Sequence, residues 1–246
     1  MGTSESLSIK RTLRRSALPF ALAAVAAASA YFASGDSLGF WFAGVAMLTA
    51  LLPPLAAREA RPGDAVLSAG AVADGVGTVW FIAALLFSSV NLGQWFFAYL
   101  VLAGYGAALF GIVLSTRHTL GPTAAAAFAV ILGFAWLTWP IWISPWLGGP
   151  VSSTLVAWLA PAHPLFAINR VFIEQGVWTQ QALMYRLTSL GQDVPLALPP
   201  SVWPCVLVHA IMGVMLGLPA AWCHSQESSR PGASEALPSS AESKGP

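Results

Sequence analysis

The sequence predicts an all-α fold, a polytopic integral membrane helix bundle with about six transmembrane helices. Of the 246 residues, 57% are apolar and only 9% are charged, whereas roughly a quarter of the residues in soluble domains are charged. The apolar residues gather in runs of about 20, the length that a helix needs to cross roughly 30 Å of hydrocarbon. The formal net charge of +1 leaves no basic surface for nucleic acid, so nucleic-acid binding is excluded.

Six apolar runs separated by short polar breaks are the predicted spans. They lie at 17–34, 38–57, 66–88, 92–115, 121–146 and 202–222. Together they form a transmembrane domain, 17–222, which follows a basic N-terminal segment, 1–16, on the cytoplasmic side. The tail, 223–246, is rich in Ser, Pro, Gly and Ala and has no apolar periodicity, so we expect it to be disordered and cytoplasmic.

The distribution of Lys and Arg orients the predicted spans, because cytoplasmic loops carry the positive excess. Nine of the 11 lie on one side of the membrane, and the other side has only Arg170 and Arg186. Both termini are therefore predicted to be cytoplasmic. The first span also has the features of a signal peptide with Ala28-Ser29-Ala30 as its cleavage site, and cleavage there would leave the orientation of the later spans unchanged.

Residues 147–201 form an outer segment that is far longer than the other connections, and loops of that length are usually functional. Within it, the run from Ala160 to Pro164 (APAHP) separates two apolar stretches that are each too short to span, which predicts a re-entrant or interfacial hairpin before the last span. The alternative is a continuous seventh span from Pro150 to Ile173, which would place the tail outside. Counting Lys and Arg does not separate these alternatives, and the two prolines favour the hairpin.

Two polar side chains inside the predicted spans are candidates for a functional role. Asp74 lies in the third span, where a charge costs roughly 2.5–3.5 kcal/mol unless it faces a bundle interior, water or a partner. His209 lies in the sixth span, where it could hydrogen-bond across helices or carry protons. Either residue could instead be structural, hydrogen-bonded between helices.

Further candidates lie in the outer segment and the last spans. His163, Asn169 and Arg170 belong to the predicted hairpin. Gly213 and Gly217 form a GxxxG pattern, which is typical of a close helix-packing face. Tryptophans near the outer end of the fifth span fit an aromatic belt at the headgroup level, with a stacking platform for a lipid or sugar as the alternative. They are Trp136, Trp139, Trp142 and Trp146.

Signatures of catalysis, metal binding and nucleotide binding are absent from the sequence. It contains no HExxH, no GxSxG, no Gly-rich phosphate loop and no pair of adjacent carboxylates within a span. On one helix, Cys205 and Cys223 would be roughly 27 Å apart, too far to form a disulfide. We therefore expect no enzymatic activity, no catalytic residues, no metal and no cofactor, and any ATP hydrolysis would belong to another chain.

Six spans with cytoplasmic ends, basic residues directly before the first span and a Pro-broken hairpin before the last resemble the type-2 ABC exporter permease family. The stretch from Leu159 to Asn169 (LAPAHPLFAIN) is similar to the short Pro-containing run that such permeases carry between the fifth and sixth spans. The resemblance implies a homo- or heterodimer in the bacterial inner (cytoplasmic) membrane. It also implies a separate ATPase subunit and the export of a lipid, polysaccharide, drug or peptide.

The partner of such a permease would bind its cytoplasmic face, where Arg58 and Arg61 are candidates for docking the ATPase. The same arginines could instead serve only to set the topology. Besides membrane lipid and the ATPase, no further partner is indicated. The rival from another class is a non-catalytic membrane scaffold or accessory subunit of a larger complex, for which few polar residues inside the spans would suffice.

The predicted topology can be tested by reporter fusions. Fusions after residues 36, 90 and 190 should report outside, and fusions after 62, 117 and the C-terminus should report inside, because the positive residues hold those loops in the cytoplasm. A reporter with opposite activities on the two sides of the membrane gives the measurement. A C-terminal reporter found outside would contradict the hairpin and indicate a seventh span in its place.

Overall fold

The computed structural model describes residues 17, 19–29, 38–56, 70–79, 81–82, 91–142, 150–172 and 198–228. All regular secondary structure in these ranges is helical, which confirms the all-α class. Helical segments 19–29 and 70–79 accompany the principal elements. These elements are α2 (Leu38–Ala56), α4 (Leu92–Leu120), α5 (Pro122–Trp142), α6 (Pro150–Leu159), the 3-10 turn η2 (Ala160–Ala162), α7 (Pro164–Val171) and α9 (Trp203–Ser228).

Three helices of the described part of the chain are long and apolar enough to cross a membrane. They are Leu92–Leu120, Pro122–Ile141 and Trp203–Ala220, and Pro19–Ser29 and Gly44–Ala56 are shorter apolar helices. The chain is therefore a helical membrane protein. By length and composition, these three helices correspond to the fourth, fifth and sixth predicted spans, and the described residues do not confirm the count of six.

Two helix ends differ from the prediction. The polar run at 115–118 is not a break, because the hydroxyls of Ser115 and Thr116 donate to the Ile112 carbonyl at 3.0 and 2.7 Å within α4. The turn comes at Gly121, whose φ of 79° lies in a region that favours glycine and whose N–H donates to the Arg117 carbonyl. At the other end of the chain, α9 continues beyond residue 222 to Ser228, and the remaining tail lies outside the described residues.

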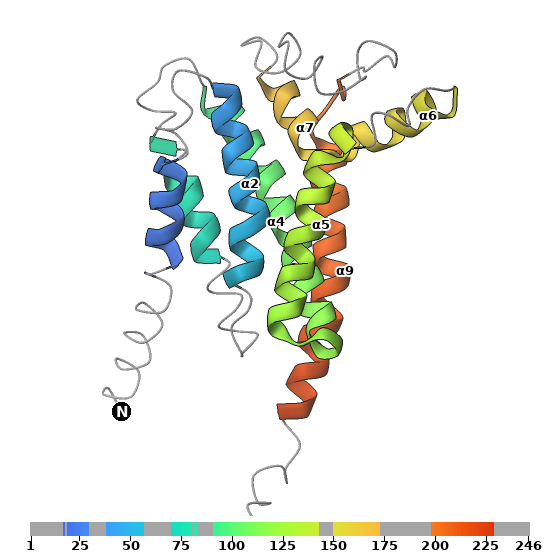
Figure 1. Cartoon of the computed structure of the whole chain (residues 1–246). Helices are drawn as coiled ribbons and strands as arrows, with labels where there is room; N and C mark the ends of the chain where they lie inside the picture. Colours follow the sequence, from blue (N-terminus) through green and yellow to red (C-terminus); the bar gives the residue numbers. More distant parts are fainter. Residues whose placement is uncertain are drawn as a thin grey trace, which may run out of the picture.

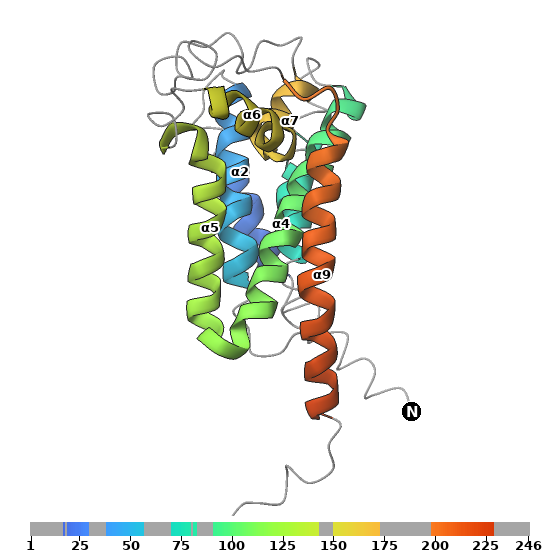
Figure 2. The same cartoon turned by 90° about the vertical axis from the view of Figure 1, so that its right-hand side faces the viewer.

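Helix α4 is the central element and packs against α9, α5, α2 and α7. Helices α4 and α9 begin at the same end of the bundle and run parallel, while α5 runs in the opposite direction (Figures 1 and 2). Helices α4 and α9 approach closely because a glycine on each helix faces the backbone of the other. A Cβ atom on Gly213 would lie 2.7 Å from the Ala107 carbonyl oxygen, and one on Gly111 would lie 2.8 Å from the Gly213 carbonyl oxygen.

The segment before α9 forms two short helices: α6 projects sideways from one end of the bundle, and α7 turns back over that end (Figure 1). The chain breaks at Ala160–Ala162, where Pro161 and Pro164 lack the N–H that a continuous helix requires. Helix α7 packs on α4 and α2, and η2 packs on α9. In the described residues, 150–171 is therefore a broken helix pair and not a continuous span.

The close contact between α4 and α9 predicts unequal effects of two glycine substitutions. Gly213→Ala should lower the free energy of unfolding by roughly 1–3 kcal/mol relative to Gly217→Ala, because its Cβ meets backbone that cannot move cheaply. A Cβ on Gly217 would lie 3.8 Å from Leu114, an ordinary contact, so this variant is the matched control. Both variants gain the same helix propensity. Thermal unfolding in detergent measures the difference, and equal melting temperatures would contradict the close approach.

Candidate functional site

The helical segment 70–79 is held between two neighbours through its glycines. A Cβ on Gly75 would lie 2.5 Å from the Phe20 carbonyl oxygen, and a Cβ on Gly77 would lie 2.7 Å from Cε2 of Tyr99 on α4. Only residues without a side chain allow both approaches. The segment is thereby fixed with the Asp74 side chain exposed on the wall of a surface cavity.

This cavity of about 530 Å³, called here the Asp74 cavity, combines one carboxylate with aromatic rings. The rings of Trp95 and Tyr99 are stacked with centroids 5.5 Å apart, and the Phe81 ring meets Trp95 edge to face at 5.2 Å. The Asp74 carboxylate and the Tyr99 phenol line the same cavity. Among the described residues, no Lys, Arg or His lines the cavity. Its lining is Phe20, Asp74, Gly77, Thr78, Phe81, Trp95 and Tyr99.

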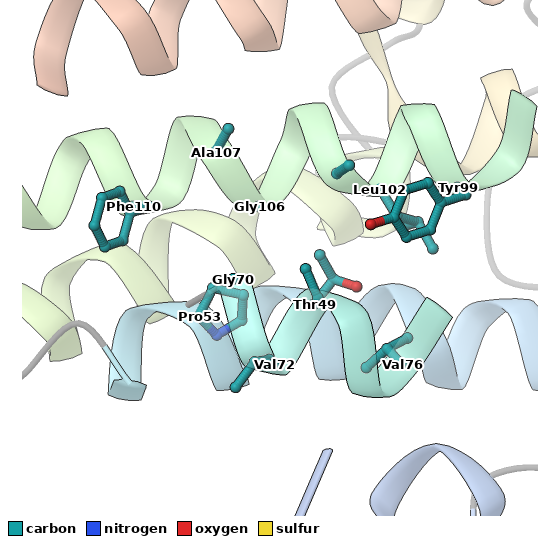
Figure 3. Close-up of a pocket in the computed structure, with 12 residues that line it drawn as sticks. Thr49, Pro53, Gly70, Val72, Val76, Tyr99, Leu102, Gly106, Ala107 and Phe110 are labelled. Atoms are coloured by element: carbon teal, nitrogen blue, oxygen red, sulfur yellow. The ribbon is translucent and has the colours of Figure 1, made fainter. Parts of the chain in front are cut away.

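A second cavity of about 280 Å³, called here the Thr49 cavity, lies between α4 on one wall and α2 with segment 70–79 on the other (Figure 3). Apart from Thr49 and Tyr99, its lining is made of apolar side chains and glycines, and Tyr99 also lines the Asp74 cavity. The Thr49 hydroxyl donates to the Val45 carbonyl at 2.9 Å. The lining residues are Thr49, Pro53, Gly70, Val72, Ala73, Val76, Tyr99, Leu102, Ala103, Gly106, Ala107 and Phe110.

His163 closes a break in the hydrogen bonding of α5. Because Pro140 has no N–H, the Trp136 carbonyl loses its usual helical donor. Nε2 of His163 lies 3.1 Å from the Trp136 oxygen and 3.2 Å from the Leu137 oxygen, so this nitrogen carries a proton and donates. Burial lowers the pKa of His163 well below its usual range, so the ring is neutral. The buried ring also packs on Phe166, at a centroid distance of 4.5 Å.

His209 lies at the junction of α4, α5 and α9. Its Nδ1 donates to the Cys205 carbonyl at 2.8 Å, which is a bond within its own helix. Its ring meets Tyr105 edge to face at 5.4 Å, and Trp136 lies at 6.4 Å. Cys205 in turn donates its thiol to the Ala162 carbonyl of η2 at 3.3 Å. His209 and His163 therefore flank Trp136 from different elements, while Asp74 shares no described contact with either.

Arg170 lines a third cavity, of about 430 Å³, where α4 and α9 begin, whereas its neighbour Asn169 is buried. In the capping box of α4, Asn91 Oδ1 accepts from the Gln94 N–H at 2.8 Å. The Gln94 side chain also donates to the Val171 carbonyl at 3.3 Å, which joins α4 to α7. The polar groups around Arg170 thus serve mainly to hold the hairpin.

The other predicted site residues fall in two groups. Gly213 and Gly217 lie on the face of α9 that packs on α4. Arg58 and Arg61 lie outside the described residues. Within the part of the chain that the structure describes, no three His, Cys, Asp or Glu side chains gather as metal ligands.

Sequence reasoning did not single out Trp95, Tyr99 or Tyr105. Trp95 and Tyr99 are spaced i, i+4 on one helix and therefore share a face, which is a signal that the sequence does contain. Tyr105 donates its hydroxyl to the Gly133 carbonyl of α5 at 2.8 Å. No sequence pattern indicates that partner, because it depends on how α4 and α5 pack.

No protein-family model matches this chain, and no curated protein matches it. The geometry of the described residues therefore carries the functional argument.

The role of His163 can be tested by a rescue experiment. His163→Leu leaves the Trp136 carbonyl without a donor, which should cost roughly 1–3 kcal/mol of stability. Pro140→Ala restores the helical N–H at that carbonyl, so it should offset part of the loss, and thermal unfolding of the four proteins gives the coupling. Tyr105→Phe, which removes a bond to Gly133, is the control that Pro140→Ala should not rescue. Strict additivity of His163→Leu and Pro140→Ala would contradict the proposed bond.

Proposed function

We propose that the chain is the membrane-spanning permease subunit of an exporter driven by a separate ATPase. The observation that carries this proposal is the broken hairpin α6–η2–α7, whose η2 and α7 are fastened to one end of the bundle and which precedes α9, the last described helix. Three bonds support it: His163 to α5, Cys205 to η2 and Gln94 to α7. A scaffold needs only apolar faces, whereas these bonds hold a Pro-broken hairpin at one end of the bundle.

The proposed topology has six spans in the bacterial inner membrane, with both termini cytoplasmic. The turn between α4 and α5, which follows Arg117, and the C-terminal end of α9 lie at the end of the bundle opposite the hairpin (Figure 2). A cytoplasmic position for the end that carries Arg117 accords with the positive excess of cytoplasmic loops. The hairpin would then face outward, where a released substrate leaves.

Two cavities that share Tyr99 favour a permease over a scaffold, because transport requires a place for the substrate within the bundle. Both lie between segment 70–79 and α4, outside the tightly packed pair of α4 and α9. Among a lipid, polysaccharide, drug or peptide, the apolar lining of the Thr49 cavity favours a lipid-like or drug-like molecule. The work of ATP hydrolysis would arrive through the cytoplasmic face.

Purification of the native complex in mild detergent tests the permease proposal. An ATPase subunit should accompany the wild-type chain, and Arg58→Glu with Arg61→Glu should release it, because charged residues at the rim of an interface set recognition. The basic residues from Lys10 to Arg15 remain in this variant to hold the orientation. Arg170→Glu, a charge reversal within α7 of the hairpin, is the control and should retain the ATPase.

Mass spectrometry of the purified complexes identifies the subunits. If no ATPase accompanies the wild-type chain in any detergent, the permease proposal fails and the scaffold takes its place. If the double variant inserts normally and keeps its ATPase, the docking role of Arg58 and Arg61 is wrong.

A further inference from the structure

The Asp74 cavity places a negative charge among aromatic rings in an otherwise apolar bundle. We infer that this cavity binds a lipophilic organic cation, an ammonium or phosphonium group carried on an apolar body. Four rings, from Phe20, Phe81, Trp95 and Tyr99, line the cavity together with the Asp74 carboxylate. They come from three separate helical segments, so the arrangement is a property of the folded bundle.

The charge of the lining selects for a cation. No described Lys, Arg or His lines the cavity, and no described residue forms an ion pair with Asp74. An anion would therefore be repelled by the carboxylate without compensation. A ligand cation supplies the counter-charge that this carboxylate in an apolar segment lacks among the described residues.

The kind of cation follows from the scarcity of oxygen ligands. Calcium takes about six to eight oxygen ligands, whereas one carboxylate and the hydroxyls of Thr78 and Tyr99 are the side-chain oxygen groups of this lining. Aromatic faces attract weakly hydrated organic cations through the ring quadrupole, with the best interaction at Trp. Trp95 and Tyr99, stacked at 5.5 Å beside the carboxylate, provide this type of surface.

The apolar body of the ligand is expected from the neighbouring Thr49 cavity. Tyr99 lines both cavities, and Ala73 of the Thr49 cavity directly precedes Asp74 of the other. A molecule with its charge at Asp74 would find an apolar cavity of about 280 Å³ next to it. As a substrate site, this cavity rests on the proposed permease function, whereas cation binding by the isolated chain can be measured independently of it.

The test is equilibrium binding to the full chain in lipid nanodiscs, with empty nanodiscs subtracted. Tetraphenylphosphonium and tetraphenylborate are the probes, because they share one shape and carry opposite charges. The phosphonium should bind saturably, and the borate should bind at least about tenfold more weakly, a difference of roughly 1.4 kcal/mol. This comparison uses the wild-type chain and depends on no variant.

Variants locate the binding in the cavity. Asp74→Asn keeps the size of the side chain and should weaken phosphonium binding about tenfold, while Asp74→Glu keeps the charge and should retain most of it. Trp95→Leu should weaken binding about fivefold through the loss of the cation–π contact. Phe96→Leu is the matched control, because Phe96 is an exposed neighbour on α4 that lines none of the three cavities, and it should have no effect. Thermal unfolding confirms that each variant is folded.

Equal binding of the two probes, or wild-type phosphonium affinity in folded Asp74→Asn, would overturn the inference. Either result would leave the permease proposal standing, since that proposal is tested by the accompanying ATPase. Phosphonium binding to a chain that has no ATPase partner would support the cation site and contradict the permease proposal.

Discussion

The backbone contact between α4 and α9 is the constraint on which the rest of the structure depends. Gly111 and Gly213 bring the two helices so close that a Cβ on either would meet backbone atoms of the partner. In lipid, helix association is driven by such packing, because the hydrocarbon is as apolar as the side chains. With α9 fixed on one side of α4, the start of α9 holds η2, and the remaining faces of α4 are left for α5, α2 and segment 70–79.

The prolines impose the second constraint, since a backbone carbonyl in a membrane finds no water to replace a lost helical donor. The prolines inside α5 and α2 have different consequences. At Pro140, the released Trp136 carbonyl receives the imidazole of His163, so the break in α5 becomes an attachment point for the hairpin. In α2, Pro53 and Pro54 remove the donors for the carbonyls of Thr49 and Ala50. Thr49 and Pro53 both line the Thr49 cavity, so the loosened part of α2 is where the bundle is hollow.

The two sides of α4 differ in packing: the side that faces α9 is tightly packed, and the side near Asp74 has cavities. Where α4 faces α9, glycines bring backbone against backbone, and His209 lies buried among rings. Where α4 faces segment 70–79, the ring of Tyr99 packs against Gly77, and the neighbouring side chains leave cavities between the two segments. A carboxylate in an apolar segment costs several kcal/mol unless it has water or a counter-charge. Its position on a surface cavity, and not in the packed core, lowers that cost.

Much of the architecture could be predicted from particular residues. The apolar runs at 92–115, 121–146 and 202–222 correspond to the three long helices, and the prolines on either side of Ala162 mark a break that the structure contains. The sequence predicts the end of α4 too early, because Ser and Thr indicate a loop, whereas the hydroxyls of Ser115 and Thr116 bond back to a helix carbonyl. Asp74 stood out from the sequence because a charge there is costly.

The sequence by itself determined that the protein lies in a membrane and is helical. It also determined the break before the last helix and the unusual position of Asp74. Only the tertiary structure decided that Asp74 lies beside Trp95 and Tyr99, that His163 binds the α5 break, and that Gly213 meets Ala107. The reason is physical: in a soluble helix the apolar stripe indicates which face is buried, but a membrane helix is apolar on all sides. The pattern of apolar residues therefore does not tell which helices are neighbours, and this is fixed by side-chain shape and by single polar contacts.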